Sequence, residues 1–127
     1  MSSVKWIENK LNAPEYRPVT ASDARAALEF WRGAPFYAPS PLVRLPGAAR
    51  ELGLGALALK DEGRRFGPGS FKLLGAGCAM ARAMLGEGPL SWEAASNPPR
   101  SLRFYTATDG NHGRAVAYLA RLLGQRA

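Results

Sequence analysis

Twice along this chain, a short apolar run is followed by a polar loop that contains glycine and then by a longer amphipathic run. The first apolar run covers residues 56–60 and leads to the amphipathic residues 71–85. The second covers residues 102–107 and leads to the amphipathic residues 110–123. Short apolar runs are typical of strands, and apolar spacings of three and four residues are typical of helices. The order strand, helix, strand, helix predicts an α/β fold in which parallel strands are joined by helical crossovers.

The apolar spacing also predicts the buried face of each long helix. In residues 71–85, which Gly86 would end, the apolar positions that recur on one side are Phe71, Leu74, Cys78, Ala81 and Leu85. In residues 110–123, the positions expected to face inward are Val116, Leu119, Ala120 and Leu123. Cys78 is therefore interpreted as a core residue.

The N-terminal part of the chain is expected to hold one further helix. Residues 1–19 are polar and contain two prolines, which predicts an irregular arm. Thr20 or Ser22 can cap a helix that ends at about Trp31, before a glycine and a proline. The apolar positions expected on its buried face are Ala24, Ala27, Leu28 and Trp31.

Prolines and glycines define the remaining connections. Pro39 and Pro41 favour an extended segment, because each disfavours helix in the residue before it. A short helix is expected over residues 46–52, ended by Gly53. Residues 91–100 include two adjacent prolines and are expected to form a polar loop.

Composition and charge argue against several classes of protein. The 127 residues carry a net charge of +7, but the 17 Lys and Arg are spread along the chain and accompany no nucleic-acid-binding motif. We therefore interpret the charge as a solvated basic surface and expect no nucleic-acid partner. No apolar run approaches the ~20 residues that a membrane span needs, so no membrane partner is expected. A single cysteine and an N-terminus without the apolar core of a signal peptide favour the cytoplasm.

Two short motifs lie at the strand-to-helix junctions. Ser70-Phe71-Lys72 places a lysine after a buried phenylalanine at the first turn of a helix, where the helix dipole disfavours an ammonium ion. A free lysine amine can attack an aldehyde and form a Schiff base. The second motif, Thr108-Asp109-Gly110-Asn111-His112-Gly113, holds the only histidine of the chain between two glycines. Such a loop can bring the backbone close to a polar ligand at the carboxyl end of a strand.

The two motifs together resemble those of the fold type II pyridoxal-phosphate (PLP) enzymes, the superfamily of tryptophan synthase β and threonine dehydratase. The resemblance runs from about Phe36 to Gln125. It implies a tryptophan synthase β-like fold, PLP as the cofactor, and Lys72 as the lysine that forms the Schiff base. It also implies that Asn111 donates its amide N–H to the phenolic oxygen of PLP.

Asp109 limits the resemblance to one group within the superfamily, because most other members have a different residue at this position. With Lys60-Asp61-Glu62 and Arg65-Phe66-Gly67 upstream, this variant is similar to the diaminopropionate ammonia-lyases. The resemblance implies α,β-elimination of 2,3-diaminopropionate to pyruvate and ammonia by a homodimeric enzyme with an amino-acid substrate. Lys72 and Asp109 would be the catalytic residues, and Lys72 and Asn111 would hold PLP. The alternatives are a threonine or serine dehydratase, and a catalytically silent fragment.

Several of these residues have simpler interpretations. Asp109 can cap the following helix, and Asn111 can occupy a left-handed turn. His112 has no Cys or acidic cluster at ligand spacing, so we expect no metal site and a packing or hydrogen-bonding role. The charged residues 61–69 are interpreted as a solvated turn, with a salt-bridged loop near the active site as the alternative.

The number of strands indicates an incomplete fold. Two parallel strands leave both edges unpaired, and no tetraglycine-like loop that could hold the cofactor phosphate occurs in the sequence. We therefore expect an N-terminal portion of a PLP-dependent lyase. Residues 1–35 would form its arm and first helix, and residues 36–127 a truncated tryptophan synthase β-like domain. Residues 1–127 alone are expected to be poorly folded or self-associating.

Overall fold

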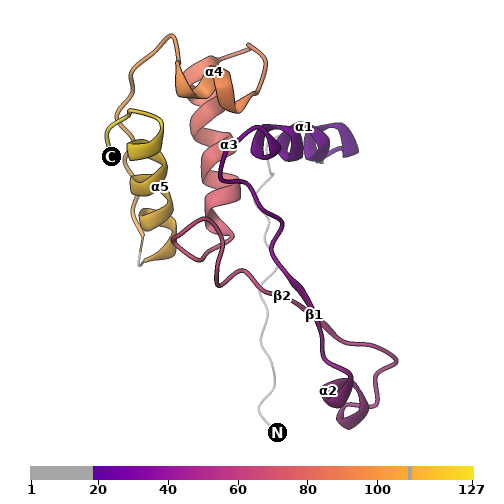
Figure 1. Ribbon diagram of the computed structural model, residues 1–127. Helices are drawn as coiled ribbons and strands as arrows, with labels where there is room; N and C mark the ends of the chain where they lie inside the picture. Colours follow the sequence, from indigo (N-terminus) through magenta and orange to yellow (C-terminus); the bar gives the residue numbers. More distant parts are fainter. Residues whose placement is uncertain (1–18, 109) are drawn as a thin grey trace, which may run out of the picture.

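The computed structural model describes residues 19–108 and 110–127. It contains a body of packed helices and a two-stranded sheet that extends away from them, with one short helix at the far end of the sheet (Figure 1). In chain order the elements are α1 (Ala21–Arg32), β1 (Leu42–Arg44), α2 (Pro46–Glu51), β2 (Ala58–Lys60), α3 (Lys72–Leu85), α4 (Trp92–Ser96) and α5 (Asn111–Leu122). In this described part, no helix is long and apolar enough to cross a membrane.

Helix α1 begins at the cap that the sequence predicts. The Thr20 hydroxyl accepts a hydrogen bond from the Asp23 N–H, and the Asp23 carboxylate accepts one from the Thr20 N–H, which forms a capping box. The predicted buried face is only partly correct. Trp31 is buried, but Leu28 is 40% exposed and Phe30 is fully buried. The reason is that Phe30 and Trp31 both pack into an aromatic cluster with residues from outside the helix.

The two strands form an antiparallel pair, with Val43 opposite Leu59. The strand predicted at 56–60 is present as β2, but its partner β1 lies in a segment for which no strand was predicted. Helix α2 connects the two strands and has Pro46 in its first turn, which agrees with the short helix predicted there. We refer to residues 42–60 as the hairpin arm. All residues of β1 and β2 are exposed, so neither face of the sheet is buried.

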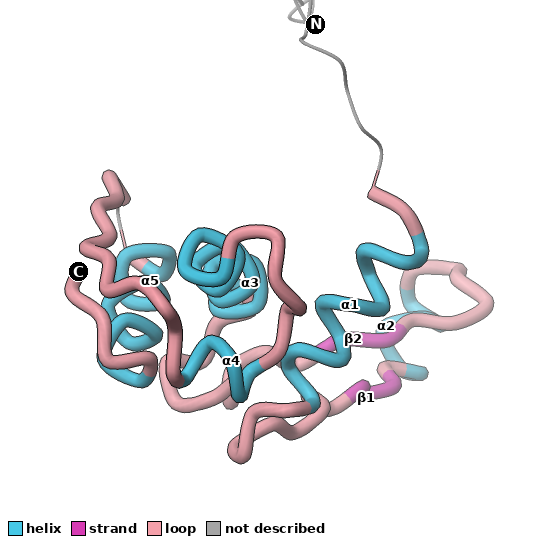
Figure 2. Tube along the Cα trace, turned by 90° about the horizontal axis from the view of Figure 1, so that it is seen from above, coloured by secondary structure: helices cyan, strands magenta, loops and turns pink. Residues whose placement is uncertain are grey.

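Helices α3 and α5 lie side by side (Figure 2), and α3 is the central helix, because it also contacts α4 and α1. The inward positions predicted for α5 are confirmed, because Val116, Leu119, Ala120 and Leu123 are all buried. The stripe predicted for α3 is partly correct. Ala81 is fully buried, and Leu74, Cys78 and Leu85 are partly buried and pack against the core. Phe71, however, is 60% exposed, and the large residues buried on α3 are Leu73, Met80 and Met84. Contacts with α5, α4 and α1 on different sides of α3 determine which side is covered, and spacing alone does not specify these neighbours.

The polar loop predicted over residues 91–100 contains a helix. The Ser91 hydroxyl accepts a hydrogen bond from the Ala94 N–H and caps α4, and Trp92 is 8% exposed. Trp92 packs against Phe30 and Phe36, and this burial explains why a polar segment with two prolines still forms a helical turn.

The parallel pairing predicted between residues 56–60 and 102–107 does not form in the described part of the chain, where residues 102–107 make one isolated bridge instead. Arg103 pairs in parallel with Arg126, through hydrogen bonds from the Phe104 N–H to the Arg126 carbonyl (2.9 Å) and from the Arg126 N–H to the Leu102 carbonyl (3.3 Å). The chain therefore returns beside residues 102–104 after α5. The predicted strand does not form over its full length, because in the described residues only Arg126 lies opposite it.

Candidate active site

An open cleft of about 520 Å³ lies where α3 and α5 begin. It is lined by Lys72, Ala107, Thr108, Gly110, Asn111 and His112. Two of the three residues predicted to carry the chemistry, Lys72 and Asn111, therefore face one cleft from two different helices. The third, Asp109, lies outside the described residues.

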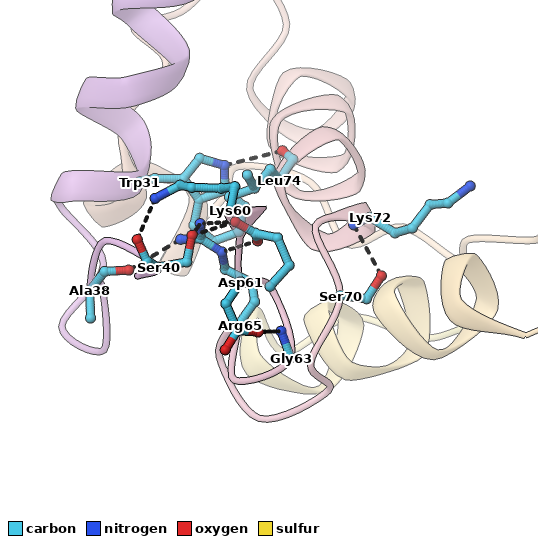
Figure 3. Close-up of polar contacts among 11 residues, drawn as sticks. Trp31, Ala38, Ser40, Lys60, Asp61, Gly63, Arg65, Ser70, Lys72 and Leu74 are labelled. Carbon is cyan, nitrogen blue, oxygen red and sulfur yellow. Dashed lines mark hydrogen bonds and ion pairs between the residues drawn. The ribbon is translucent and has the colours of Figure 1, made fainter. Parts of the chain in front are cut away.

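Lys72 is the first residue of α3 and is held through its backbone. Its N–H donates a hydrogen bond to the Ser70 hydroxyl (3.3 Å), and Ser70 is only 6% exposed. The side chain extends away from the neighbouring polar contacts (Figure 3). Its Nζ lies 5.8 Å from the centre of the Phe71 ring. Phe71 was expected to be buried, but it is exposed, so Lys72 stands at an open surface.

Thr108 closes the loop in front of α5. Its hydroxyl oxygen accepts hydrogen bonds from the N–H groups of Gly110 and Gly113, each at 3.3 Å. A Cβ on Gly113 would lie 2.3 Å from the Thr108 methyl carbon, so only glycine permits this approach. The Gly113 N–H, in the first turn of α5, therefore has a side-chain acceptor in Thr108.

His112 differs from the packing role predicted for it, whereas Cys78 agrees in part with its interpretation as a core residue, because it packs against the core. His112 is exposed at the cleft and is not packed in the core. Cys78 is half-buried beside a second cavity, and this burial raises the pKa of its thiol, which favours the neutral form.

The charged loop between β2 and α3 is not the solvated turn that the sequence suggested. Arg65 is 6% exposed, and its guanidinium contacts both carboxylate oxygens of Glu62 (Nε–Oε2 2.6 Å and Nη2–Oε1 2.7 Å). It also donates hydrogen bonds to the Ala38 carbonyl (3.1 Å) and the Ser40 hydroxyl (2.6 Å) (Figure 3). Hydrogen bonding to Arg65 lowers the pKa of Glu62 to about 2. The spacing of Glu62 and Arg65 allowed an ion pair, but nothing in the sequence identified their partners in residues 38–40.

A family model described as "Pyridoxal-phosphate dependent enzyme" matches residues 34–127. The chain belongs to this family. Membership confirms the fold class inferred from the two motifs, and it confirms PLP as the cofactor of the family to which those motifs point. The matched region contains both sides of the cleft.

The curated relatives are diaminopropionate ammonia-lyases. The enzyme of Escherichia coli K12 is 38% identical over 127 aligned residues, which cover 94% of this chain and 32% of the relative. The enzyme of Salmonella typhimurium LT2 is 39% identical over 110 residues, which cover 79% of this chain and 27% of the relative. The chain thus spans about a third of the length of the relatives it matches.

Solved structures of the E. coli enzyme agree with this relationship. The apo form superposes with a TM-score of 0.76 at 38% identity, over 84% of this chain and 30% of that chain. The complex with D-serine superposes with a TM-score of 0.75 over the same share of this chain and 29% of that chain.

Proposed function

We propose that this chain forms the lysine-bearing part of a PLP-dependent ammonia-lyase that converts 2,3-diaminopropionate to pyruvate and ammonia. The observation that carries the proposal is the common cleft of Lys72 and Asn111, in a chain 38% identical to diaminopropionate ammonia-lyases. The reaction is an α,β-elimination, in which the α-proton and the β-amino group leave the substrate, and hydrolysis of the resulting aminoacrylate then gives pyruvate and a second ammonia.

The residues of the cleft fit PLP. The cofactor presents an aldehyde, a phenolic oxygen and a pyridine ring, and the cleft offers an exposed primary amine and a side-chain amide. Its volume of about 520 Å³ lies within the range of about 300–1,000 Å³ of small-molecule sites. When bound, PLP supplies an electron sink for the carbanion that forms at the substrate α-carbon.

Each residue then has a distinct task. Lys72 would hold the cofactor through its Nζ and would also be the base that accepts the substrate α-proton at that nitrogen. Asn111 would donate its amide N–H to the phenolic oxygen of the ring. Asp109 binds the second amino group of the substrate or exchanges a proton with the α-carbon on the face opposite Lys72.

A chimera provides a complete enzyme for the test. In this chimera, residues 34–127 of this chain replace the matching segment of the E. coli diaminopropionate ammonia-lyase. After incubation with PLP, borohydride reduction and peptide mapping should place the pyridoxyl group on Lys72. Lys60, whose Nζ donates a hydrogen bond to the Ser40 carbonyl, is the control, and Lys60→Arg should leave the labelling unchanged. A label on any lysine other than Lys72 contradicts the proposal.

We further propose that the enzyme is a cytoplasmic homodimer that acts on a free amino acid. The single cysteine of the chain supports a reducing compartment, and the family resemblance supports the dimer. Sedimentation equilibrium of the chimera, compared with the E. coli enzyme, tests the dimer, and a monomeric chimera with full activity would contradict it.

A further inference from the structure

We propose that Arg65 is a positioning residue whose loop, which includes the stacked Phe66, fixes the start of α3, and with it Lys72, beside the cleft. This inference rests on the proposed function, because it concerns the lysine that would hold PLP. It starts from Lys72 itself. Among the described residues, no polar side chain contacts the Lys72 Nζ, so its location depends on the backbone that enters α3.

That backbone belongs to a loop that is tied to the chain ahead of it. The Asp61 N–H donates a hydrogen bond to the Pro41 carbonyl, and the Gly69 N–H donates one to the Arg65 carbonyl, both at 2.9 Å. The guanidinium of Arg65 connects this loop to Ala38 and Ser40. The loop that leads into Lys72 therefore contacts residues 38–41 through the buried Arg65 side chain and through the Asp61 N–H.

Phe66 connects the same loop to α1. It has a φ of 47°, a left-handed conformation that is costly for a large side chain, and it is only 9% exposed. Its ring stacks on Trp31 with centroids 5.3 Å apart and meets the edge of Phe36 at the same distance. Backbone strain of this kind persists only where the surroundings enforce it, and it concentrates at functional sites.

Trp31 completes the connection to the helix that carries Lys72. Its Nε1–H donates a hydrogen bond to the Leu74 carbonyl (3.1 Å), two residues beyond Lys72. The first turn of α3 is therefore held from two directions. The Arg65 loop holds it through Ser70, and the Phe66 ring holds it through Trp31.

The experiment uses the chimera with Arg65→Gln, which removes the charge that binds Glu62, and Arg64→Gln as the matched control. Arg64 is the exposed neighbour. Visible absorbance follows the formation of the bond between Lys72 and added PLP. The rate of this bond formation, divided by the amount of PLP bound, should fall about tenfold in Arg65→Gln. It should stay at the parent value in Arg64→Gln. Arg65→Lys should recover part of the rate, because an ammonium can keep one bond to Glu62.

Amide hydrogen exchange provides a readout that needs no PLP. In Arg65→Gln, the N–H groups of residues 72–74 should exchange faster relative to those of α5, whereas a general loss of stability would accelerate both. Should Arg65→Gln fail to fold, Ser40→Ala removes only one partner of the guanidinium and should give the same pattern more weakly. Bonding rate and exchange equal to the parent in the folded variant would overturn the inference.

The two proposals fail in different ways. If the parent chimera never carries a label on Lys72 but Arg65→Gln still accelerates exchange at residues 72–74, the proposed function is wrong and the positioning stands. If Lys72 is labelled, but Arg65→Gln changes neither the rate of PLP bonding nor the amide exchange, the proposed function stands and the positioning role is wrong.

Discussion

At the scale of single residues, Asp109 gives the sharpest prediction about the substrate. In the chimera, Asp109→Asn should retain PLP, since Lys72 and Asn111 are unchanged, but should lose activity toward diaminopropionate by ~100-fold to ~10,000-fold. Asp109→Glu, which keeps the carboxylate, should lose less. Steady-state rates with each enantiomer of the substrate are the measurement.

The two enantiomers separate the possible roles of this carboxylate. A proton-transferring Asp109 on the face opposite Lys72 should make the loss larger for one enantiomer. Equal large losses would indicate that Asp109 binds the amine, and a loss well below tenfold would indicate a role in the turn alone.

Glu62 gives a prediction about pH. Its pKa is lowered from the ordinary 4.5 to about 2 by the hydrogen bond from Arg65. The folded-state pKa lies below the unfolded one, so the ion pair contributes its full stability above pH 4.5 and loses it as the pH falls toward 2. Thermal melts of the chimera between these pH values should show a decline that Glu62→Gln reduces. Parallel declines in both proteins would contradict the assignment.

At the scale of elements, two glycines in α3 make a matched pair. A Cβ at Gly77 would lie 2.4 Å from the Trp31 ring, whereas a Cβ at Gly75 would meet nothing within 4 Å. Gly77→Ala should therefore destabilise the fold by about 1–3 kcal/mol through overpacking. Gly75→Ala should stabilise it by about 0.5–1 kcal/mol, because alanine is the better helix former. Denaturant unfolding of the chimera measures both, and a stabilising Gly77→Ala would refute the close packing of α1 on α3.

Local signals in the sequence predicted some elements well and others poorly. The Thr20 cap, the inward face of α5 and the junction at Lys72 follow from neighbouring residues, and the structure confirms the first two and places Lys72 at the start of α3. The buried side of α3, the partner of β2 and the burial of Arg65 depend on segments far away in the chain. Spacing within one helix or loop carries no information about these contacts, so they could not be predicted.

At the scale of the whole molecule, the hairpin arm determines how these 127 residues behave on their own. It exposes large apolar side chains that no described residue covers, among them Leu42 (65%), Leu52 (66%) and Leu59 (53%). The outer edges of β1 and β2 also carry no further strand in the described part of the chain. Exposed apolar strands with open edges pair with one another, so association is expected through this arm.

We predict that residues 1–127, produced alone, show a mass that rises with concentration in sedimentation velocity. Leu59→Lys should reduce this association, because it places a charge on the paired strands, without changing the helical signal in circular dichroism. Val19→Lys is the matched control, since Val19 is apolar and 79% exposed but lies outside the hairpin arm. A monodisperse monomer with a sharp cooperative melt would contradict the prediction, and so would association that Leu59→Lys and Val19→Lys reduce equally. In the chimera, where the remaining two thirds of the E. coli enzyme are present, Leu59→Lys should instead lower the thermal stability more than Val19→Lys does.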